Sequence, residues 1–414
     1  MTMHPMLRAL RRHKAGVSLI VLQIALTLAI VCNALFIIGQ RLERLNRPTG
    51  VQESGLIRLS QTWLNAPTTD DAAAVEQLDA LQRTDLATLR QLPGVLDVAA
   101  SDSMPLTGSV WSAGIRTDRE QKSTITQAAL YYGDQHLLPT FGLRLVAGRN
   151  FTADEVDHHT IRSMLATPFA IVTRALANTL FPHGDALGKT IYLDVRPATI
   201  VGIVERLQTP TVAEWGSDWA YDAVLLPVRL DGATASYALR VPPGREQSVI
   251  RAARDALFAV NPMRDMPDTW GAQSMREIRY RAYRGDRGTA LLLGIVCVIL
   301  LGVTAAGIVG LTSFWIGQRR RQIGIRRALG ARRIDILNYF QLENLFIASV
   351  GVCVGVLLAL GLNAWLIARY AMPRMPTPFL GAGVIALLLI GQAAVFVPAR
   401  RASQVPPLVA TRSP

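Results

Sequence analysis

Four long uncharged stretches constrain the fold of this 414-residue chain more than any other feature. Each is long enough to cross a hydrocarbon core of about 30 Å as an α-helix rising about 1.5 Å per residue. The stretches are Ala15–Gln40, Gly288–Gln318, Asn344–Ala368 and Met375–Ala399. We therefore expect one transmembrane helix near the N-terminus, three near the C-terminus and a large domain, residues 41–287, between the first and second. This layout excludes most soluble enzymes.

The positive charge of the chain lies at its ends. The net charge is +13, yet residues 41–287 contain 27 Lys and Arg against 28 Asp and Glu. Cytoplasmic loops of membrane proteins carry an excess of Lys and Arg. This rule places residues 1–14, 319–343 and 400–414 in the cytoplasm, and residues 41–287 and the short loop 369–374 on the outer side of the membrane. A nucleic-acid partner is not expected, because its basic patch would lie on the folded domain.

The first apolar stretch is predicted to be a retained anchor rather than a cleaved signal peptide. Its apolar run exceeds the usual length of about 7–15 residues, and no A-x-A-like site follows. The cysteines Cys32, Cys297 and Cys353 all lie in apolar stretches. The large domain therefore has to be stable without disulfides, and its length is sufficient for one core or for two subdomains.

The large domain mixes helical and strand patterns. Apolar residues recur at helical spacing over Ala72–Leu92, and Pro93-Gly94 stops this helix. Further helices are predicted at Arg174–Phe181 and Arg245–Val260. Strands are predicted at Leu56–Leu59, Val95–Ala100, Thr124–Tyr132, Phe169–Val172, Thr190–Leu193, Thr199–Val204, Ala223–Pro227 and Tyr237–Val241. Strict βαβ alternation is missing, so the predicted class is an α+β domain attached to four transmembrane helices.

The segment Ala272–Trp315 contains no proline and changes from charged to wholly apolar. We interpret it as one continuous helix that leaves the large domain and enters the membrane as a stalk. A continuous helix resists bending unless a kink source interrupts it, and Gly285 and Gly288 are the expected soft points. The alternative is a loop near these glycines that separates two helices.

Two segments resemble catalytic or ligand sites without meeting their requirements. Gly184–Thr190 has three residues between its glycines, whereas a phosphate-binding loop has four and opens a helix. A tight turn before a strand is expected instead. The acidic run Asp154, Glu155, Asp157, His158 and His159 lacks the ligand spacing of zinc sites. We expect a solvated loop there, and predict no catalytic residue, cofactor or metal in the chain.

Small residues recur four apart inside two apolar stretches. They are Gly302, Ala306 and Gly310 in the second stretch, and Gly351 and Gly355 in the third. Such faces let helix backbones approach closely in lipid. The sequence leaves two alternatives open, namely packing within one chain and a seam between two chains. Ionisable residues are missing from all four stretches, which argues against a polar solute pathway through them.

The loop 319–343 is too polar to be buried in lipid. Gly324 and Gly330 interrupt it, and Ala331–Phe340 is predicted to form a helix with a partly apolar face. One interpretation is a basic segment that rests on anionic headgroups. A docking element for a cytoplasmic partner explains a short, structured, apolar-faced segment better.

Residues 322–331 of this loop read QIGIRRALGA. This run resembles a signature of the FtsX-like/MacB-like family of ABC transporter permeases. The family has an E-I-G-I-R-x-A-x-G-A signature after its second membrane helix, and an acid often leads into its third. Glu343 has the position of that acid, and Pro398–Ala402 resembles the family's ending. The signature residues here are Gln322, Ile323, Gly324, Ile325, Arg326, Arg327, Ala328, Leu329, Gly330 and Ala331. Gln322 departs from the usual Glu; if that acid helps to seat the ATPase subunit, its pairing must differ here.

The large domain resembles the MacB-like periplasmic core domain in several ordered motifs. These are Phe141–Leu143, Ala147–Thr152, Leu180–Pro182, Leu187–Lys189 and Ile200–Val204. Within the second motif, Thr152 is a plausible helix cap. Each motif is modest alone, but together with the loop they cover nearly the full length in order.

The resemblance implies a permease subunit of the inner membrane without ATPase activity of its own. Two permease chains, identical or related, would bind two separate ATP-binding cassette subunits. ATP-driven closure of those subunits would be transmitted mechanically to the periplasmic domains, for export or efflux. A periplasmic adaptor and an outer-membrane channel are possible further partners. The alternative from a different class is an FtsX-like signalling subunit that controls a periplasmic enzyme such as a cell-wall hydrolase.

Overall fold

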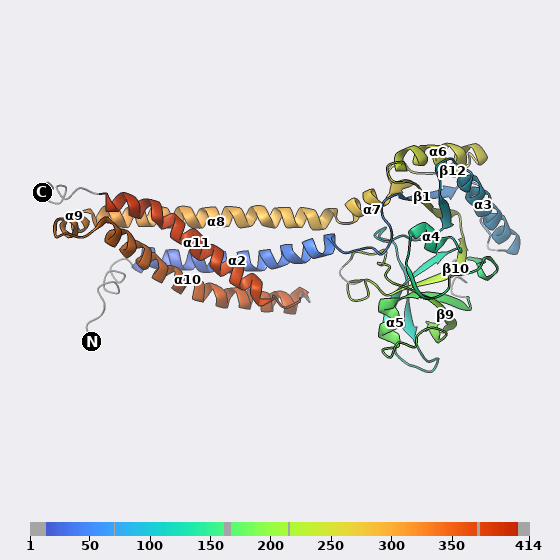
Figure 1. Cartoon of the computed structure of the whole chain (residues 1–414), viewed down its shortest axis with the longest axis horizontal. Helices are drawn as coiled ribbons and strands as arrows, with labels where there is room; N and C mark the ends of the chain where they lie inside the picture. The colour runs from blue at the N-terminus through green and yellow to red at the C-terminus, as the bar shows by residue number, and fades with distance from the viewer. Residues whose placement is uncertain (1–13, 70, 161–166, 214–215, 371–372, 405–414) are drawn as a thin grey trace. The chain divides into compact units, whose positions relative to one another are not determined.

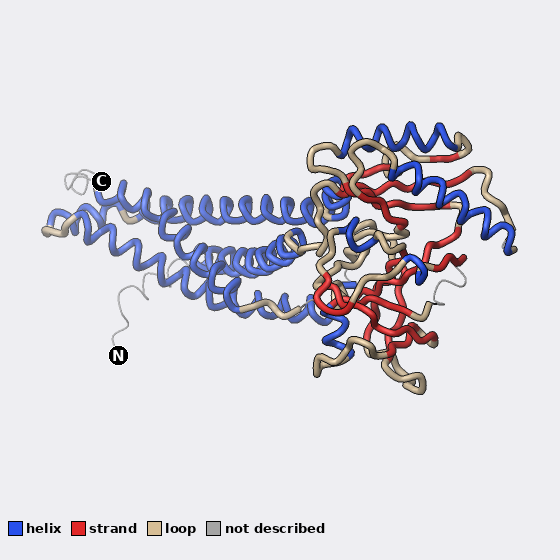
Figure 2. Tube along the Cα trace, turned by 45° about the vertical axis from the view of Figure 1, so that its right-hand side comes forward, coloured by secondary structure: helices blue, strands red, loops and turns tan. Residues whose placement is uncertain are grey.

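The computed structural model describes residues 14–69, 71–160, 167–213, 216–370 and 373–404. Its contacts divide the chain into two compact units. Residues 1–46 and 285–414 form a helical unit, and residues 47–284 form an α+β unit. Figures 1 and 2 show helices alone in the first unit and both helices and strands in the second. Several basic residues of the predicted cytoplasmic ends, Arg8, Arg11, Arg12 and Arg412, lie outside the described residues.

Four helices of the helical unit are long and apolar enough to cross a membrane. This confirms the four-helix prediction. They are α2 (Lys14–Leu45), α8 (Arg284–Gln318), α10 (Arg333–Tyr370) and α11 (Thr377–Ser403), and the short helix α9 (Arg320–Ala328) lies between α8 and α10. Both α10 and α11 pack along α2 (Figure 1). A methyl group added at Gly383 of α11 would lie 2.4 Å from Cys32 Sγ, so glycine there lets α11 approach α2 closely.

One antiparallel sheet of the α+β unit is built around β1 (Leu56–Trp63). Its strands run in the order β12 (Arg264–Asp265), β1, β11 (Thr234–Arg240) and β2 (Asp97–Ala100), and β13 (Ala272–Ser274) also pairs with β1. Helices α3 (Ala72–Arg90) and α6 (Glu246–Val260) cover one face. The core between them contains Ile57, Leu59, Trp63, Leu78, Leu86, Leu89, Tyr237 and Leu257.

A second sheet closes on itself. The strands run in the order β4 (Thr126–Gly133), β3 (Trp111–Arg116), β8 (Thr190–Leu193), β9 (Arg196–Val204), β7 (Phe169–Thr173) and β10 (Ala223–Asp231), and β10 also pairs with β4 in parallel. The strands β5 (Leu145–Gly148) and β6 (Asp157–Thr160) pair with β9 and β10. Alternate residues of the closing strands point inward, as in a small barrel.

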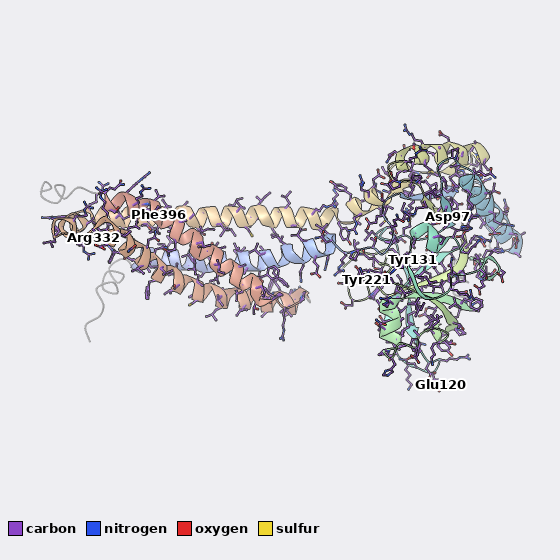
Figure 3. All side chains as sticks on the ribbon, in the orientation of Figure 1. Asp97, Glu120, Tyr131, Tyr221, Arg332 and Phe396 are labelled. Atoms are coloured by element: carbon purple, nitrogen blue, oxygen red, sulfur yellow. The ribbon has the colours of Figure 1, made fainter. Side chains whose placement is uncertain are left out.

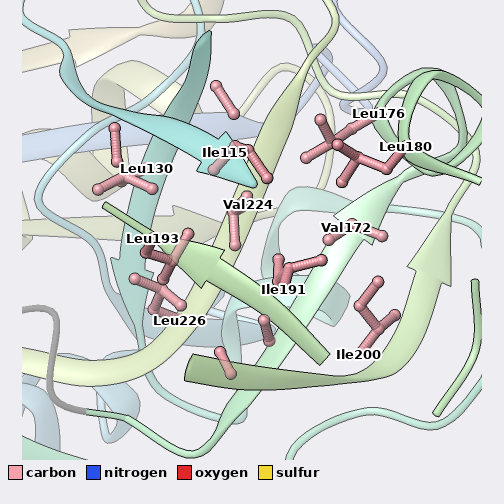
Figure 4. Close-up of a cluster of buried hydrophobic side chains, with 14 of the residues drawn as sticks. Ile115, Leu130, Val172, Leu176, Leu180, Ile191, Leu193, Ile200, Val224 and Leu226 are labelled. Atoms are coloured by element: carbon pink, nitrogen blue, oxygen red, sulfur yellow. The ribbon is translucent and has the colours of Figure 1, made fainter. Parts of the chain in front are cut away.

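Helix α5 (Arg174–Leu180) covers part of this barrel, and Figure 4 shows its Leu176 and Leu180 beside the inward-facing side chains. The helix α4 (Leu137–Phe141) and the 3-10 helix η1 (Ala153–Glu155) complete the unit. Two sheets with separate cores confirm the α+β class. The predicted helices and strands are all present in this unit, with boundaries that shift by a few residues.

The predicted continuous helix from Ala272 to Trp315 is wrong. Residues Ala272–Ser274 form β13, α7 covers Met275–Ala282, and a break at Tyr283 precedes α8. Tyr283 is buried within the α+β unit, and its hydroxyl accepts a hydrogen bond from Gln208 Nε2 at 3.1 Å. The break therefore lies at a side chain that is buried in the α+β unit. The expected soft points Gly285 and Gly288 lie inside α8, in its first turns.

Candidate functional site

The loop between α8 and α10 folds into a compact helical turn. Helix α9 ends in a Schellman motif, in which Ala331 N–H donates to Arg326 O (3.0 Å) and Gly330 N–H donates to Arg327 O (3.2 Å). Gly330 has φ +98°, a conformation that favours glycine. The sequence predicted a helix over 331–340. In the structure Arg333–Phe340 is helical, as the first part of α10, and α9 is a further short helix that precedes Gly330.

A buried ion pair fixes the start of this loop to α10. Arg319 Nη1 lies 3.0 Å from Glu343 Oε2 and 3.1 Å from Oε1, and the two side chains are 14% and 6% exposed. The sequence singled out Glu343 but missed Arg319 as its partner. The two residues are 24 positions apart, so no helical or strand periodicity connects them.

The two adjacent arginines of the signature make different contacts. The guanidinium of Arg326 lies 5.1 Å from the centroid of the Tyr339 ring on α10, a cation–π geometry. Arg327 Nη1 donates to Ser403 O at the end of α11, at 3.0 Å. Both arginines therefore attach α9 to neighbouring helices. Arg332, labelled in Figure 3, follows at the same end of the helical unit.

The residues of α9 divide into a buried and an exposed side. Ile323 and Gly324 are buried, and Ile323 packs with apolar residues of α8, α10 and α11. Ile325 and Leu329 are instead 47% and 83% exposed. We call the exposed surface of Ile325, Ala328 and Leu329 the α9 surface.

A cavity of about 360 Å³ lies beside the α9 surface. Gln322 and Arg326 of α9 line it together with residues of α10 that include Asp335 and Tyr339. Asp335 accepts a hydrogen bond from Arg332 N–H at 2.9 Å, which caps the start of α10. Gln322, the departure from the family signature, is exposed and lies at the rim between the two helices.

The two groups of small residues in the apolar helices have different surroundings. A Cβ added at Gly351 or Gly355 would lie 2.9 Å from Ile24 or Leu28 of α2. A Cβ added at Gly302 or Gly310 would meet nothing within 4 Å, and Ala306 is exposed. The first group packs within the chain, whereas the second leaves a face of α8 without a partner among the described residues.

The structure confirms the turn that the sequence predicted at Gly184–Thr190 and the helix cap that it predicted at Thr152. The residues Gly184–Lys189 form a turn in which Lys189 N–H donates to Ala186 O (3.2 Å), and β8 follows. Thr152 and Glu155 form a capping box around η1. Arg149 donates to Glu155 at 2.7 Å, and this hydrogen bond lowers the pKa of Glu155 to about 2.

The expected solvated loop over the acidic run is wrong in part, because Asp157, His158 and His159 lie in β6 and both histidines are half-buried. His158 joins a cluster of charged side chains there. His158 Nδ1 lies 2.9 Å from Asp231 Oδ2, and burial raises the pKa of Asp231 to about 6. Glu76, Asp79 and His158 bring ligand atoms within 4.8 Å of one another. Asp79, however, already accepts hydrogen bonds from Arg229 (2.6 Å), and it pairs with Arg83 (2.8 Å). Two guanidinium groups at one carboxylate disfavour a cation there.

Two family models match the chain in order. The MacB-like periplasmic core domain matches residues 18–261, and the FtsX-like permease C-terminal model matches residues 294–407. Among solved structures, the periplasmic region of MacB from Actinobacillus actinomycetemcomitans has a TM-score of 0.35 and 14% identity, and covers 58% of this chain and 97% of its own.

Curated relatives include the macrolide export ATP-binding/permease protein MacB of Chromobacterium violaceum, which is 27% identical over 77% of this chain and 48% of its own length. The pyoverdine export ATP-binding/permease protein PvdT of Pseudomonas savastanoi pv. phaseolicola is 27% identical over 80% of this chain and 48% of its own. The chain spans about half the length of these relatives. Because the periplasmic-core model alone matches more than half of the chain, the chain belongs to the family of ABC transporter permeases with a MacB-like periplasmic core domain and an FtsX-like C-terminal region.

Proposed function

We propose that this chain is a permease subunit that uses ATP hydrolysis by a separate ATPase subunit to drive conformational change in its α+β unit, for export. The observation that carries this proposal is the α9 surface. It combines two exposed apolar side chains, Ile325 and Leu329, with a helix that is attached to its neighbours by charged contacts. Exposed apolar residues on a short, fixed helix suit docking to a protein partner.

The contacts of α9 support mechanical transmission. Arg319–Glu343 joins the end of α8 to α10, and Arg327 joins α9 to the end of α11. A displacement of α9 by a partner would therefore move three long helices together. Helix α8 is uninterrupted from Arg284 to Gln318, so it can carry such a displacement along its length.

We propose an inner-membrane orientation with α9 and both termini in the cytoplasm and the α+β unit in the periplasm. The excess of arginine on α9 and at the end of α11 supports it. Protease added to intact spheroplasts should then cleave within residues 100–250. Protection of these residues, together with cleavage at α9, would reverse the orientation.

A second permease chain is proposed along α8. Gly302, Ala306 and Gly310 form an exposed face on which another helix can approach closely. A dimer of permease chains would present two α9 surfaces, one for each of two ATPase subunits. Whether the second chain is identical, and whether an adaptor and outer-membrane channel take part, are questions for co-purification.

Export is proposed ahead of FtsX-like control of a periplasmic enzyme because two relatives carry export in their names, one for macrolides and one for pyoverdine. The two functions share the same transmission and differ in what the α+β unit acts on. If the function is export, deleting the chain should raise the sensitivity of its host to an exported compound. If the function is control of a periplasmic enzyme, the deletion should change the activity of a cell-wall hydrolase.

The docking proposal is tested by the double variant Ile325→Glu and Leu329→Glu. Both side chains are exposed, so the fold should be retained, while burial of two carboxylates against an apolar partner surface is unfavourable. We expect loss of ATPase co-purification and of output in cells. Leu96→Glu, at an exposed leucine of the α+β unit, is the matched control. Co-purification at the original level in the double variant would refute the assignment.

A further inference from the structure

Two cavities inside the α+β unit share lining residues. One, of about 530 Å³, lies between α7 and the loop 106–108. The other, of about 310 Å³, lies between β1 and β11 of the first sheet and β4 and β10 of the second. Arg58 and Trp270 line both cavities. Volumes of about 300–1,000 Å³ are typical of sites for small molecules.

Arg58 projects from β1 on the face opposite the core. Its neighbours Ile57 and Leu59 are buried in that core, so strand alternation turns Arg58 toward the cavities. Its Nη2 donates to Ser236 Oγ at 3.3 Å. Its Nε is buried and has no hydrogen-bond partner among the described residues. Burial lowers the pKa of this guanidinium. A buried donor without an acceptor is costly, which indicates that a ligand supplies one.

Tyr132 provides a second unpartnered polar group, on the wall of the smaller cavity. The residue is only 1% exposed, and within the part of the chain that the structure describes its hydroxyl has no hydrogen-bond partner. Tyrosine hydroxyls usually find a partner when buried. This hydroxyl can donate to, or accept from, a ligand in the smaller cavity.

The charges differ between the two cavities. Among the described lining residues, the larger cavity has two arginines, Arg58 and Arg281, and no acidic side chain. The smaller cavity contains Asp102, whose pKa burial raises to about 6, and Arg229, which already pairs with Asp79 at 2.6 Å. Asp102 also interacts electrostatically with Arg58, so an anionic group is favoured on the side of the larger cavity, where Arg281 adds a second positive charge.

The larger cavity is also lined by apolar side chains and by one residue with an unfavourable backbone conformation. Trp270 is 42% exposed, and Ile278 of α7 also lines this cavity. Leu106 has φ +69°, a conformation that is unfavourable for leucine. A hydrogen bond from Gly108 N–H to Pro210 O (3.0 Å) fixes the loop that contains it. Strained backbone of this kind concentrates at ligand sites.

We propose that the two cavities bind a small amphipathic carboxylate. Its carboxylate accepts hydrogen bonds from Arg58 in the larger cavity, and its apolar body stacks on Trp270. A polar group at its other end reaches the Tyr132 hydroxyl in the smaller cavity. The site lies wholly within the α+β unit, so it does not depend on the proposed docking of an ATPase at α9.

The test measures binding by calorimetry to the full chain in lipid nanodiscs. The probe is 2-naphthoate, and its neutral analogue 2-naphthamide is the control ligand. Since a hydrogen bond to a charged group contributes about 1.5–3 kcal/mol, naphthoate should bind about tenfold or more tightly than naphthamide. Arg58→Gln should remove this preference. Arg251→Gln, at an exposed arginine of α6, should leave it unchanged.

Two further variants keep the proposal testable if Arg58→Gln does not fold. Tyr132→Phe should weaken binding of 6-hydroxy-2-naphthoate and leave 2-naphthoate unaffected, because only the former offers a group to this hydroxyl. Trp270→Ala, at an exposed residue, should weaken both probes. Equal binding of naphthoate and naphthamide would indicate an apolar surface for a protein partner and overturn the proposal. So would the absence of binding up to about 5 mM, which corresponds to only about 3 kcal/mol.

Discussion

Helices α8 and α10 carry the same spacing of small residues but use it differently. Gly351 and Gly355 of α10 lie against α2, where an added Cβ would come within 2.9 Å of Ile24 or Leu28. Gly302 and Gly310 of α8 have nothing within 4 Å of such a Cβ. The spacing therefore indicates a face suited to close approach, and the fold decides whether that face is occupied within the chain.

The two helices are also held by different interactions. The most apolar window of α10 is 33% buried, whereas that of α8 is 17% buried. Ile308, Trp315 and Ile316 of α8 pack in the core of the helical unit, and polar contacts attach the helix in addition. Arg41–Asp286 (2.9 Å) lies at its first turn, Arg319–Glu343 follows its last, and Thr304 of its middle bonds to α2. A helix held at a few polar points can shift more readily than one held by close packing.

The first prediction removes a polar attachment of α8. Glu343→Gln leaves the Arg319 guanidinium buried without its counter-charge, and breaking a buried pair costs about 3–5 kcal/mol. Reversible unfolding of the purified chain in SDS should show a loss of this size. The double variant Arg319→Leu with Glu343→Leu should recover most of it, since neither charge remains. A single variant as stable as the wild type would show that α8 is held elsewhere.

The second prediction tests the packed face of α10. Gly355→Leu places a side chain where Leu28 and Ala25 of α2 already lie, and overpacking costs about 1–3 kcal/mol. The matched variant Gly310→Leu, on the open face of α8, should change the free energy of unfolding by less than about 0.5 kcal/mol. Equal losses in the two variants would remove the distinction between the helices.

These contacts separate what the sequence could predict from what it could not. Local patterns were sufficient for α3, because Leu78, Leu86 and Leu89 recur at helical spacing and face one core. Local patterns did not predict β3 (Trp111–Arg116). Its first two residues are exposed and its middle contains Gly114, so the sequence lacks the apolar–polar alternation of a half-buried strand. Closure of the barrel depends on pairing β4 with β10, nearly 100 residues later, which no local pattern encodes.

The candidate site was predictable in position but not in contacts. The signature singled out residues 322–331 and Glu343, but the sequence placed the helix after Gly330 and did not predict α9, which ends before this glycine. The partners Arg319 and Tyr339 lie across the packed helices and have no spacing that identifies them. The break in the predicted stalk could not be predicted from local spacing either. It lies at Tyr283, whose hydroxyl is bonded by Gln208, 75 positions earlier.

The third prediction weakens the middle attachment of α8. Thr27 and Thr304 hydroxyl oxygens lie 2.8 Å apart, and Thr304 also donates to Leu300 O within its own helix. Hydrogen bonds between membrane helices contribute about 0.6 kcal/mol on average. Thr27→Val should therefore lower the free energy of unfolding by about this amount in SDS titration. A loss comparable to that of Glu343→Gln would mean that α8 is attached mainly through its middle.

The last prediction concerns the open face itself, where the effect on the stability of a single chain is expected to be smallest. Gly302→Leu meets no neighbouring atom within the chain, so unfolding should be unchanged. Self-association in nanodiscs, measured by energy transfer between labelled chains, should fall about tenfold, because a leucine prevents close approach of a second helix. Gly361→Leu is the matched control, since Gly361 is equally open but lies on α10. If both variants associate as the wild type does, the small residues of α8 serve neither packing within the chain nor a seam between chains, and the second permease chain has to contact another face.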